Sequence, residues 1–353
     1  MTSFPYEICA RLVARHARRS LQAVSFYLHV QGHPLLHQAI ARHIGMMRSV
    51  HCSPEQIILT NGTQGALDLV ARALLDPGDL AWVEDPGYSG ARGVLLAAGA
   101  QLVAVRVDGE GLDFEAGRQQ LCPEARLAIV TPSHQFPTGV TMSLSRWLAL
   151  LDWSRERRAW IVEDDYDSEF RYSVRPLDAL QGMDRARRVL YIGTWSSVLF
   201  PSLRLSYLIA PPELLKGLLA MRRLIDMHLP LQEQLALTVF MAEEYYARHV
   251  RKMRQIYRAR LNAHVEALAQ ELGNILDVSA PVAGMHLVVW LPSGMSAQEA
   301  VHRAAVYGLH LLPISEFSLQ SLPHDGLLLD FAGVSPQALR AGGHTLALAL
   351  QAY

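Results

Sequence analysis

Short apolar runs alternate with helical patterns over most of this chain, and this alternation limits the possible fold more than any other feature. Gly62–Leu75 and Tyr88–Ala98 are helical patterns of this kind, and another begins near Ser143. Apolar strands separated by helices are typical of a mostly parallel sheet with helices on both faces. We therefore predict an α/β fold whose strands are, in chain order, residues 57–60, 80–84, 101–107, 127–131, 160–163 and 189–193.

Polar or Gly/Pro-rich loops follow most of these strands. In an open α/β sheet, ligands bind at the carboxyl ends of the strands, where such loops meet. We therefore expect one crevice formed by residues 60–65, 84–88, 131–139, 164–166 and 193–197.

The two ends of the chain have a different pattern from the middle. Helices are predicted at residues 5–20 and 35–47, with an extended piece over 23–30 between them. A helical stretch over 230–272 is longer than most globular helices, so we expect a bend or a domain crossing in it. A smaller α+β unit follows, with strands at 285–291, 309–313 and 327–331 and helices at 297–307 and 336–351. We predict an N-terminal segment, 1–48, packed on the small domain, a large domain, 49–228, and a small domain with its long helix, 229–353.

Composition excludes several classes of protein. The chain has 353 residues and a net charge of −1, and a polyanion-binding protein needs a clear excess of Lys and Arg. Cys9, Cys52 and Cys122 are widely spaced and form no CxxC pair, which favours a reducing compartment. The N-terminus lacks a signal-peptide core, and charges interrupt every apolar run. We expect a soluble cytoplasmic protein without a membrane span.

The first candidate binding group is the start of a helix. Gly62, Thr63 and Gln64 open a predicted helix, so free backbone N–H groups there can face an anion. An ordinary helix N-terminus explains the same residues. Thr194, Ser196 and Arg204 add hydroxyl donors and a guanidinium suited to phosphate.

Several long strings identify a family. EDPGYSGAR, VTPSHQFPTGVTMSLSR, EDDYDSEFRY and FPSLRLSYLIAP occur in the order found in aminotransferases of fold type I. The chain resembles these pyridoxal 5'-phosphate (PLP) enzymes over essentially its whole length. It most resembles the aminotransferase-like domain of MocR/GabR-type regulators of the GntR family. Those regulators also carry a winged-helix DNA-binding domain, which we expect to be absent from this chain. Members are typically homodimers with sites at the subunit interface.

The resemblance implies roles for individual residues. Gly62, Thr63, Gln64, Thr194, Ser196 and Arg204 match positions that hold the PLP phosphate. Asp164 matches the carboxylate beside the pyridine nitrogen, which keeps the ring an electron sink, although the run Glu163-Asp164-Asp165 also fits a solvated acidic loop. Tyr166 matches the tyrosine that bonds the ring hydroxyl, and Tyr88 the residue that stacks on the ring. His134 belongs to the family's PSHQFP string, and Arg92 matches an arginine that holds a substrate carboxylate.

The catalytic lysine of the family is missing. The family's turn reads Gly-Thr-Phe-Ser-Lys, and its lysine carries PLP as a Schiff base. Here the turn is Gly193-Thr194-Trp195-Ser196-Ser197, and a serine hydroxyl cannot form an imine. The only lysines are Lys216 and Lys252, and the sequence places neither near this turn.

Other positions also depart from the family pattern. Asp330 and Ser206 stand where glycine is usual, and Gly32–Leu36 replaces a Gly-Asp-Pro-Ala-Gly-like run. These positions lie near the expected site or its walls. They suggest a domain that has moved away from the parental chemistry.

Three functions remain open. The chain can be a sensor domain that binds PLP noncovalently and weakly, with a small amino acid or amine as effector. It can be an active aminotransferase, which Ser197 opposes. It can also be a lysine-free PLP enzyme that uses a histidine base, for which His134 is the candidate.

Overall fold

The computed structural model describes residues 4–19, 29–120, 124–172, 177–273, 275–276, 278 and 280–350. Cys122 and most of the extended piece predicted over 23–30 lie outside the described residues. Among the described residues, no helix combines the length and the apolar composition that a membrane crossing requires.

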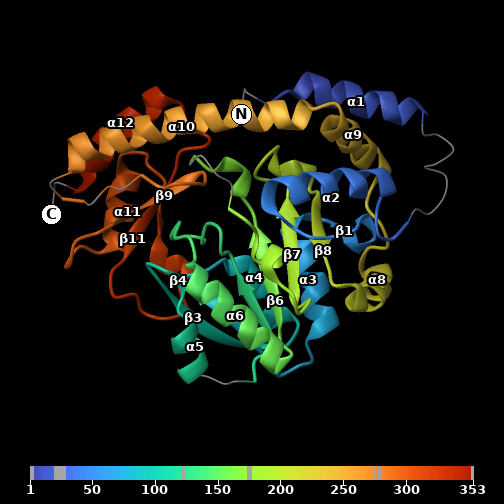
Figure 1. Cartoon of the computed structure of the whole chain (residues 1–353). Coiled ribbons are helices and arrows are strands. Elements are labelled where there is room, and N and C mark those ends of the chain that lie inside the picture. Colours follow the sequence, from blue (N-terminus) through green and yellow to red (C-terminus); the bar gives the residue numbers. More distant parts are fainter. Residues whose placement is uncertain are drawn as a thin grey trace.

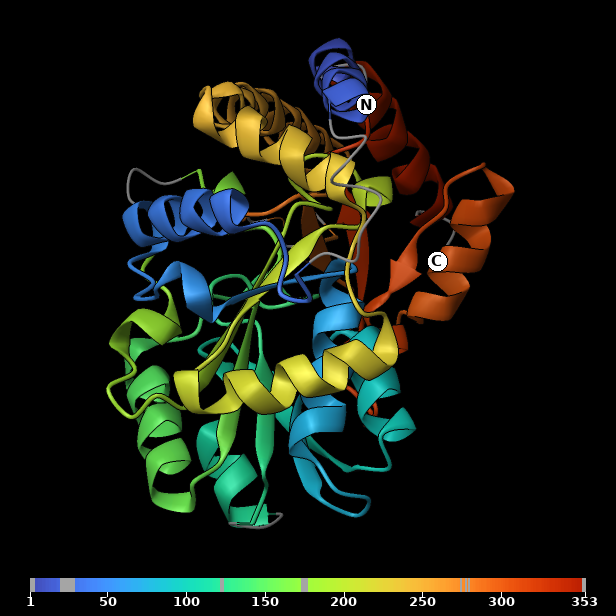
Figure 2. The same ribbon diagram turned by 90° about the vertical axis from the view of Figure 1, so that its right-hand side faces the viewer.

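The centre of the molecule is an eight-stranded sheet with the order β1-β8-β7-β6-β5-β2-β3-β4 (Figures 1 and 2). The predicted mostly parallel sheet is confirmed, since β2, β3, β5, β6 and β7 are parallel neighbours. β8 is antiparallel to both β1 and β7, so β1 runs in the same direction as β7. The strands are β1 (Ile57–Thr60), β2 (Leu80–Asp85), β3 (Gln101–Asp108), β4 (Gly111–Leu112), β5 (Leu127–Val130), β6 (Trp160–Asp165), β7 (Val189–Thr194) and β8 (Ser206–Ile209).

Helices cover both faces of this sheet, because successive strand side chains point to opposite faces. Val83 of β2 packs with α3 and α4, whereas Trp82 stacks on Trp153 of α6 with ring centroids 4.4 Å apart. Strands buried on both faces need apolar residues at every position, which explains their continuous apolar runs. The helices are α3 (Gly62–Leu74), α4 (Ser89–Ala97) and α8 (Pro212–Ile225) on one face, with α5 (Phe114–Gln120), α6 (Leu144–Arg157) and α7 (Leu180–Met183) on the other.

A smaller three-stranded sheet has the order β10-β11-β9. Its strands are antiparallel, and α10 packs along α12 beside it (Figure 1). The predicted bend in the long helical stretch is confirmed, because Glu244 with φ 60° separates α9 from α10. These elements are β9 (His286–Trp290), β10 (Leu312–Pro313), β11 (Gly326–Asp330), α9 (Leu231–Ala242), α10 (Tyr245–Leu272), α11 (Ala297–Val306) and α12 (Pro336–Leu350).

The N-terminal helices lie against α9. Both α1 (Tyr6–Arg19) and α2 (Pro34–Arg48) contact α9, and α2 also contacts the short helix η2 (Pro54–Gln56). The buried face of α2 is formed by Leu36, Ile40 and Ile44. Further short helices are η3 (Ser168–Phe170), η4 (Pro201–Leu203) and η5 (Ile314–Phe317).

The carboxylate of Asp85 joins the two sheets. It accepts hydrogen bonds from Ser318 Oγ (2.9 Å) and from the N–H groups of Leu319 (2.7 Å) and Gln320 (3.0 Å). Two of these donors are backbone groups, so the loop after η5 is held at the carboxyl end of β2. This contact positions the small sheet over the carboxyl edge of the large one.

Candidate functional site

A cavity of about 410 Å³ lies at the carboxyl edge of the large sheet. β1, β2, β5, β6 and β7 all end at this edge, and the loop after each contributes to the lining, as the sequence predicts. The small sheet supplies the facing wall. The lining residues are Thr63, Gln64, Tyr88, Thr131, Phe136, Asp164, Tyr166, Thr194, Ser196, Ser197, Arg204, Met285, His286, Leu328, Asp330 and Ala332.

The acidic run at the end of β6 is buried, so its interpretation as a solvated loop is wrong. Asp164 is 5% exposed and lines the cavity, and Oδ1 of its carboxylate has no hydrogen-bond partner among the described residues. Its neighbours Glu163 and Asp165 point to the other face, as alternation in a strand requires, and both form ion pairs with Arg48. Burial, followed by the charges of Asp165, Glu84 and Asp167, raises the pKa of Asp164 to about 8. This group needs a hydrogen-bonded or positively charged partner in the cavity.

The part of the cavity formed by the start of α3 and Arg204 is suited to an anion. Gly62 has φ +72°, and a Cβ atom there would lie 2.6 Å from the guanidinium of Arg204. Arg204 donates to the carbonyl of Asn61 (3.2 Å), and Asn61 makes no side-chain cap for α3. The first N–H groups of α3 therefore lie beside a guanidinium without a competing cap. Gly62 itself is not among the lining residues.

Two hydroxyl groups, those of Thr194 and Ser196, also line the part of the cavity that is suited to an anion. Thr194 Oγ1 accepts hydrogen bonds from the N–H of Ser196 (3.1 Å) and from Ser206 Oγ (2.7 Å). Ser206 stands where the family usually has glycine, and its hydrogen bond helps to hold the Thr194 side chain in place. Ser196 Oγ is buried and has no partner among the described residues. A phosphate would give it one.

Tyr166 is held from behind by a buried histidine. Its hydroxyl lies 2.9 Å from Nδ1 of His134, and the same nitrogen lies 2.8 Å from Oδ2 of Asp167. His134 and Asp167 are buried, and neither lines the cavity. The predicted residue His134 therefore lies behind Tyr166 and can position it.

Two further predicted residues lie on or near α4. Tyr88 lines the cavity, accepts a hydrogen bond from Gln64 Nε2 (3.1 Å) and meets the ring of Phe136 edge-on at 6.2 Å. Arg92 is buried on α4 and is not among the lining residues. Its role with a substrate carboxylate stays a prediction.

Ser197 lines the cavity, and none of the described residues that line it with Ser197 carries a primary amine. Its hydroxyl donates to the backbone carbonyl of Tyr166, which fixes the turn after β7 against the end of β6. Lys216 on α8 and Lys252 on α10 are both exposed, and neither lines the cavity.

The wall formed by the small sheet was missed by sequence reasoning, except for Asp330. His286 and Asp330 are directly opposite each other in the pairing of β9 with β11. His286 Nε2 lies 3.1 Å from the carbonyl of Pro137, and burial lowers the pKa of this histidine to about 4, so its ring is neutral. Asp330 is exposed at the end of β11, and partial desolvation raises its pKa. Thr131 and Phe136 were placed in a pocket loop but not singled out.

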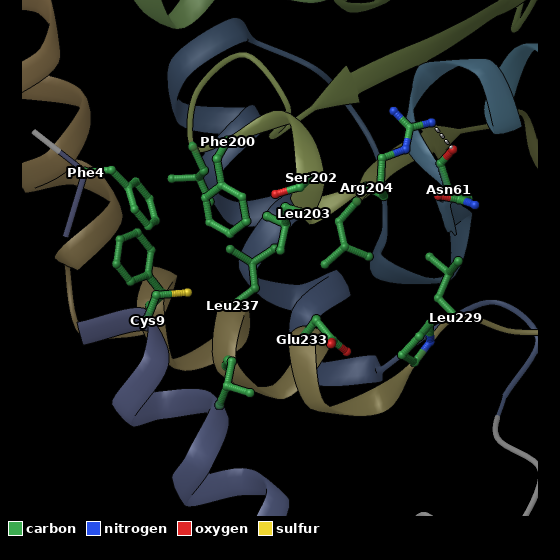
Figure 3. Close-up of a pocket in the computed structure, with 16 residues that line it drawn as sticks. Phe4, Cys9, Asn61, Phe200, Ser202, Leu203, Arg204, Leu229, Glu233 and Leu237 are labelled. Carbon is green, nitrogen blue, oxygen red and sulfur yellow. Dashed lines mark hydrogen bonds between the residues drawn. The ribbon is translucent and has the colours of Figure 1, made fainter. Parts of the chain in front are cut away.

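A second cavity, of about 420 Å³, lies beside the first and is mostly apolar (Figure 3). Phe4 and Cys9 line it from the N-terminal part, and Leu237 lines it from α9. Arg204 lines both cavities, and its hydrogen bond to Asn61 is visible in Figure 3. Arg204 therefore forms part of the boundary between the two spaces.

This arrangement fits a phosphorylated pyridine. The guanidinium, the α3 N-terminus and the hydroxyls suit a phosphate, and the unpaired carboxylate oxygen of Asp164 suits a protonated ring nitrogen. The fold and the site together define an α/β domain of the PLP-dependent transferase type, fold type I. The chain belongs to the aminotransferase class I and II family, whose model matches residues 3–341.

Curated relatives include both regulators and enzymes. The chain is 41% identical over 347 residues to a probable rhizopine catabolism regulatory protein, MocR, of Rhizobium meliloti, covering 98% of this chain and 69% of that protein. It is 30% identical over 352 residues to 2-aminoadipate transaminase of Thermus thermophilus, covering 99% of this chain and 87% of the enzyme.

Solved aminotransferase structures have the same fold. Kynurenine aminotransferase of Pyrococcus horikoshii matches with a TM-score of 0.91 at 26% identity, over 99% of this chain and 88% of that one. The α-aminoadipate aminotransferase LysN of Thermus thermophilus matches with a TM-score of 0.90 at 29% identity, over 99% of this chain and 90% of that one.

Proposed function

We propose that this chain is a sensor domain of MocR/GabR type that binds PLP noncovalently, together with a small amino acid or amine effector. One observation carries the proposal: the cavity has a complete donor set for the cofactor, and Ser197 stands in it without an amine. Without a covalent link, binding is weaker than in an aminotransferase. Amino transfer is negligible, because no lining residue has a primary amine.

The residue roles in this proposal are those that the family resemblance implies, and the lining of the cavity supports them. Thr63, Gln64, Thr194, Ser196 and Arg204 hold the phosphate, and Gly62 leaves space for the guanidinium. Asp164 holds the ring nitrogen, Tyr166 the ring hydroxyl, and Tyr88 stacks on the ring. His134 positions Tyr166, and Arg92 is kept as a substrate contact. When bound, PLP supplies an electron sink for the carbon next to an amine.

Further proposals concern the whole protein. The names of the relatives support a regulatory role in transcription. We propose with it a cytoplasmic location and a homodimer, which the family resemblance implies. We also propose the division into an N-terminal segment, 1–48, a large PLP-binding domain, 49–228, and a long helix with the small domain, 229–353.

A lysine-free PLP enzyme is the second candidate. The neutral ring of His286 lines the cavity, whereas His134 does not. The carbonyl of Pro137 can only accept, so Nε2 of His286 carries the hydrogen and Nδ1 is the basic nitrogen. His286 is the histidine on the cavity wall, but a pKa of about 4 makes it a weak base at neutral pH. An active aminotransferase that uses a lysine is disfavoured, because none of the residues that line this cavity is a lysine.

Ser197→Lys tests the proposal. The new amine enters the cavity, and we expect a borohydride-stable link to PLP and measurable amino transfer in this variant only. Ser202→Lys is the control, because Ser202 is exposed on η4 and does not line this cavity. Comparable amino transfer by the unmodified protein would contradict the proposal.

A further inference from the structure

We infer that the effector of this site is an amine whose far end carries a second positive charge, and that Asp330 recognises that charge. This inference rests on the proposed function, because the reacting amine must meet bound PLP. Its basis is the distribution of charge around the cavity. Among the described residues that line the cavity, the charged ones are Arg204, Asp164 and Asp330.

Two of these residues are committed to the cofactor. Arg204 lies at the start of α3, where the phosphate fits, and Asp164 lies at the end of β6, where the ring nitrogen fits. Both belong to the wall formed by the large sheet. What remains for the effector is the facing wall, formed by Met285, His286, Leu328, Asp330 and Ala332.

This facing wall carries one charge, and it is negative. Met285, Leu328 and Ala332 are apolar, and burial keeps the ring of His286 neutral. Neither arginine nor lysine lines it within the described part of the chain. A carboxylate on the far end of an effector would therefore meet Asp330 with no arginine or lysine among the residues that line this wall.

The carboxylate of Asp330 is oriented but not neutralised. Its Oδ1 accepts the N–H of Ala332 (2.7 Å), which fixes the side chain at the end of β11. The charge of Arg260 partly lowers the pKa of Asp330. The guanidinium of Arg260 nevertheless donates to the carbonyl of Ala332. Asp330 itself has no ion pair among the described residues. Asp330 is exposed at the end of β11, and partial desolvation raises its pKa, so an added ammonium beside it would be stabilised by the negative charge.

Three amines that differ only at the far end give a direct test. Pentylamine ends in a methyl group, cadaverine in an ammonium and δ-aminovalerate in a carboxylate. Each is titrated into the PLP-loaded protein, and its dissociation constant is measured by calorimetry and by the visible spectrum, with free PLP at the same concentration as the blank. Asp330→Asn keeps the acceptor for Ala332 and removes the charge. Glu266→Gln is the matched control, because Glu266 is exposed on α10 and does not line the cavity.

We expect cadaverine to bind about tenfold more tightly than pentylamine, and δ-aminovalerate to bind most weakly. Asp330→Asn should remove the advantage of cadaverine and leave pentylamine unchanged, and Glu266→Gln should change neither. Equal affinities, or tightest binding of δ-aminovalerate, would overturn the inference while leaving PLP binding intact. Failure of the unmodified protein to bind PLP before any amine is added would overturn the proposed function and this inference together.

Discussion

Neighbouring carboxylates at the end of β6 point to opposite faces of the sheet and have different surroundings. Glu163 and Asp165 face Arg48, whereas Asp164 faces the cavity and has no ion pair among the described residues. Three buried acids in a row are costly, because each charge lies in a poorly solvated environment. The protein keeps Asp164 where a cationic ring nitrogen would neutralise it. This crowding makes the stability of the cofactor-free protein depend on pH.

The contribution of Asp164 to the free energy of unfolding should fall as the pH rises between about 4 and 8. The pKa of Asp164 is about 8 in the folded protein and 3.8 without its surroundings, so the folded state binds more protons between these values. The side chain in the Asp164→Asn variant does not titrate. The free energy of unfolding, measured with urea, should therefore depend less steeply on pH in this variant, by up to about 1.4 kcal/mol per pH unit. Asp152→Asn, an exposed carboxyl on α6, is the control and should leave the slope unchanged. An unchanged slope in Asp164→Asn would show that Asp164 is ionised in the free protein.

At the residue scale, the sequence predicted which residues of the large sheet meet at one cavity but not how deeply the acidic run is buried. Asp164, Tyr166, Thr194, Ser196, Ser197 and Arg204 all line the cavity. The burial of the acidic run could not be predicted, since Glu163-Asp164-Asp165 has the composition of a surface loop. Its partner Arg48 lies on α2, 117 residues away in sequence from Asp165, and no local pattern connects them.

The β1–α3 connection is the element that shapes the anion end. β1 is buried on both faces, and α3 begins directly after it at Gly62. Gly62 has a positive φ, and its missing side chain leaves the space that the guanidinium of Arg204 occupies. Both properties require glycine, so the same position sets the backbone turn and the place of the cation.

Gly62→Ala separates these two effects when it is compared with Gly78→Ala. Gly78 has φ +94°, and no atom lies within 4 Å of the position that a Cβ would take there, so alanine costs backbone strain only. Both variants should lose about 1 kcal/mol of unfolding free energy. Only Gly62→Ala should also weaken PLP binding, by about tenfold or more, because Arg204 must move. Equal PLP affinities in the two variants, from fluorescence titration, would exclude Arg204 from the phosphate site.

At the element scale, helices and strands with strong patterns were predicted to within a few residues. The break of the long helical stretch at Glu244 was expected from its length, although no proline or glycine marks it. The short strand β4 and helix α5 were not predicted, since two and seven residues respectively give too little periodicity.

The whole molecule brings two distant parts of the chain to one cavity. The large sheet supplies the groups that fit PLP, and the small sheet supplies the wall that faces them. Asp85 fixes the two parts together through the loop after η5. Sequence patterns place polar residues at the ends of parallel strands but do not show which strands of a second sheet will face them. Asp330 was therefore the one residue of the facing wall that the sequence singled out.

The central claim is that the site holds PLP without a covalent bond, and one measurement tests it most directly. The purified protein is titrated with PLP, its visible absorbance is recorded, and the sample is then reduced with borohydride and weighed by intact-protein mass spectrometry. We expect saturable binding, with no added mass from covalent cofactor after reduction. Covalent cofactor mapped to Lys216 or Lys252 would contradict noncovalent binding, and absence of any saturable binding would contradict the cofactor site itself.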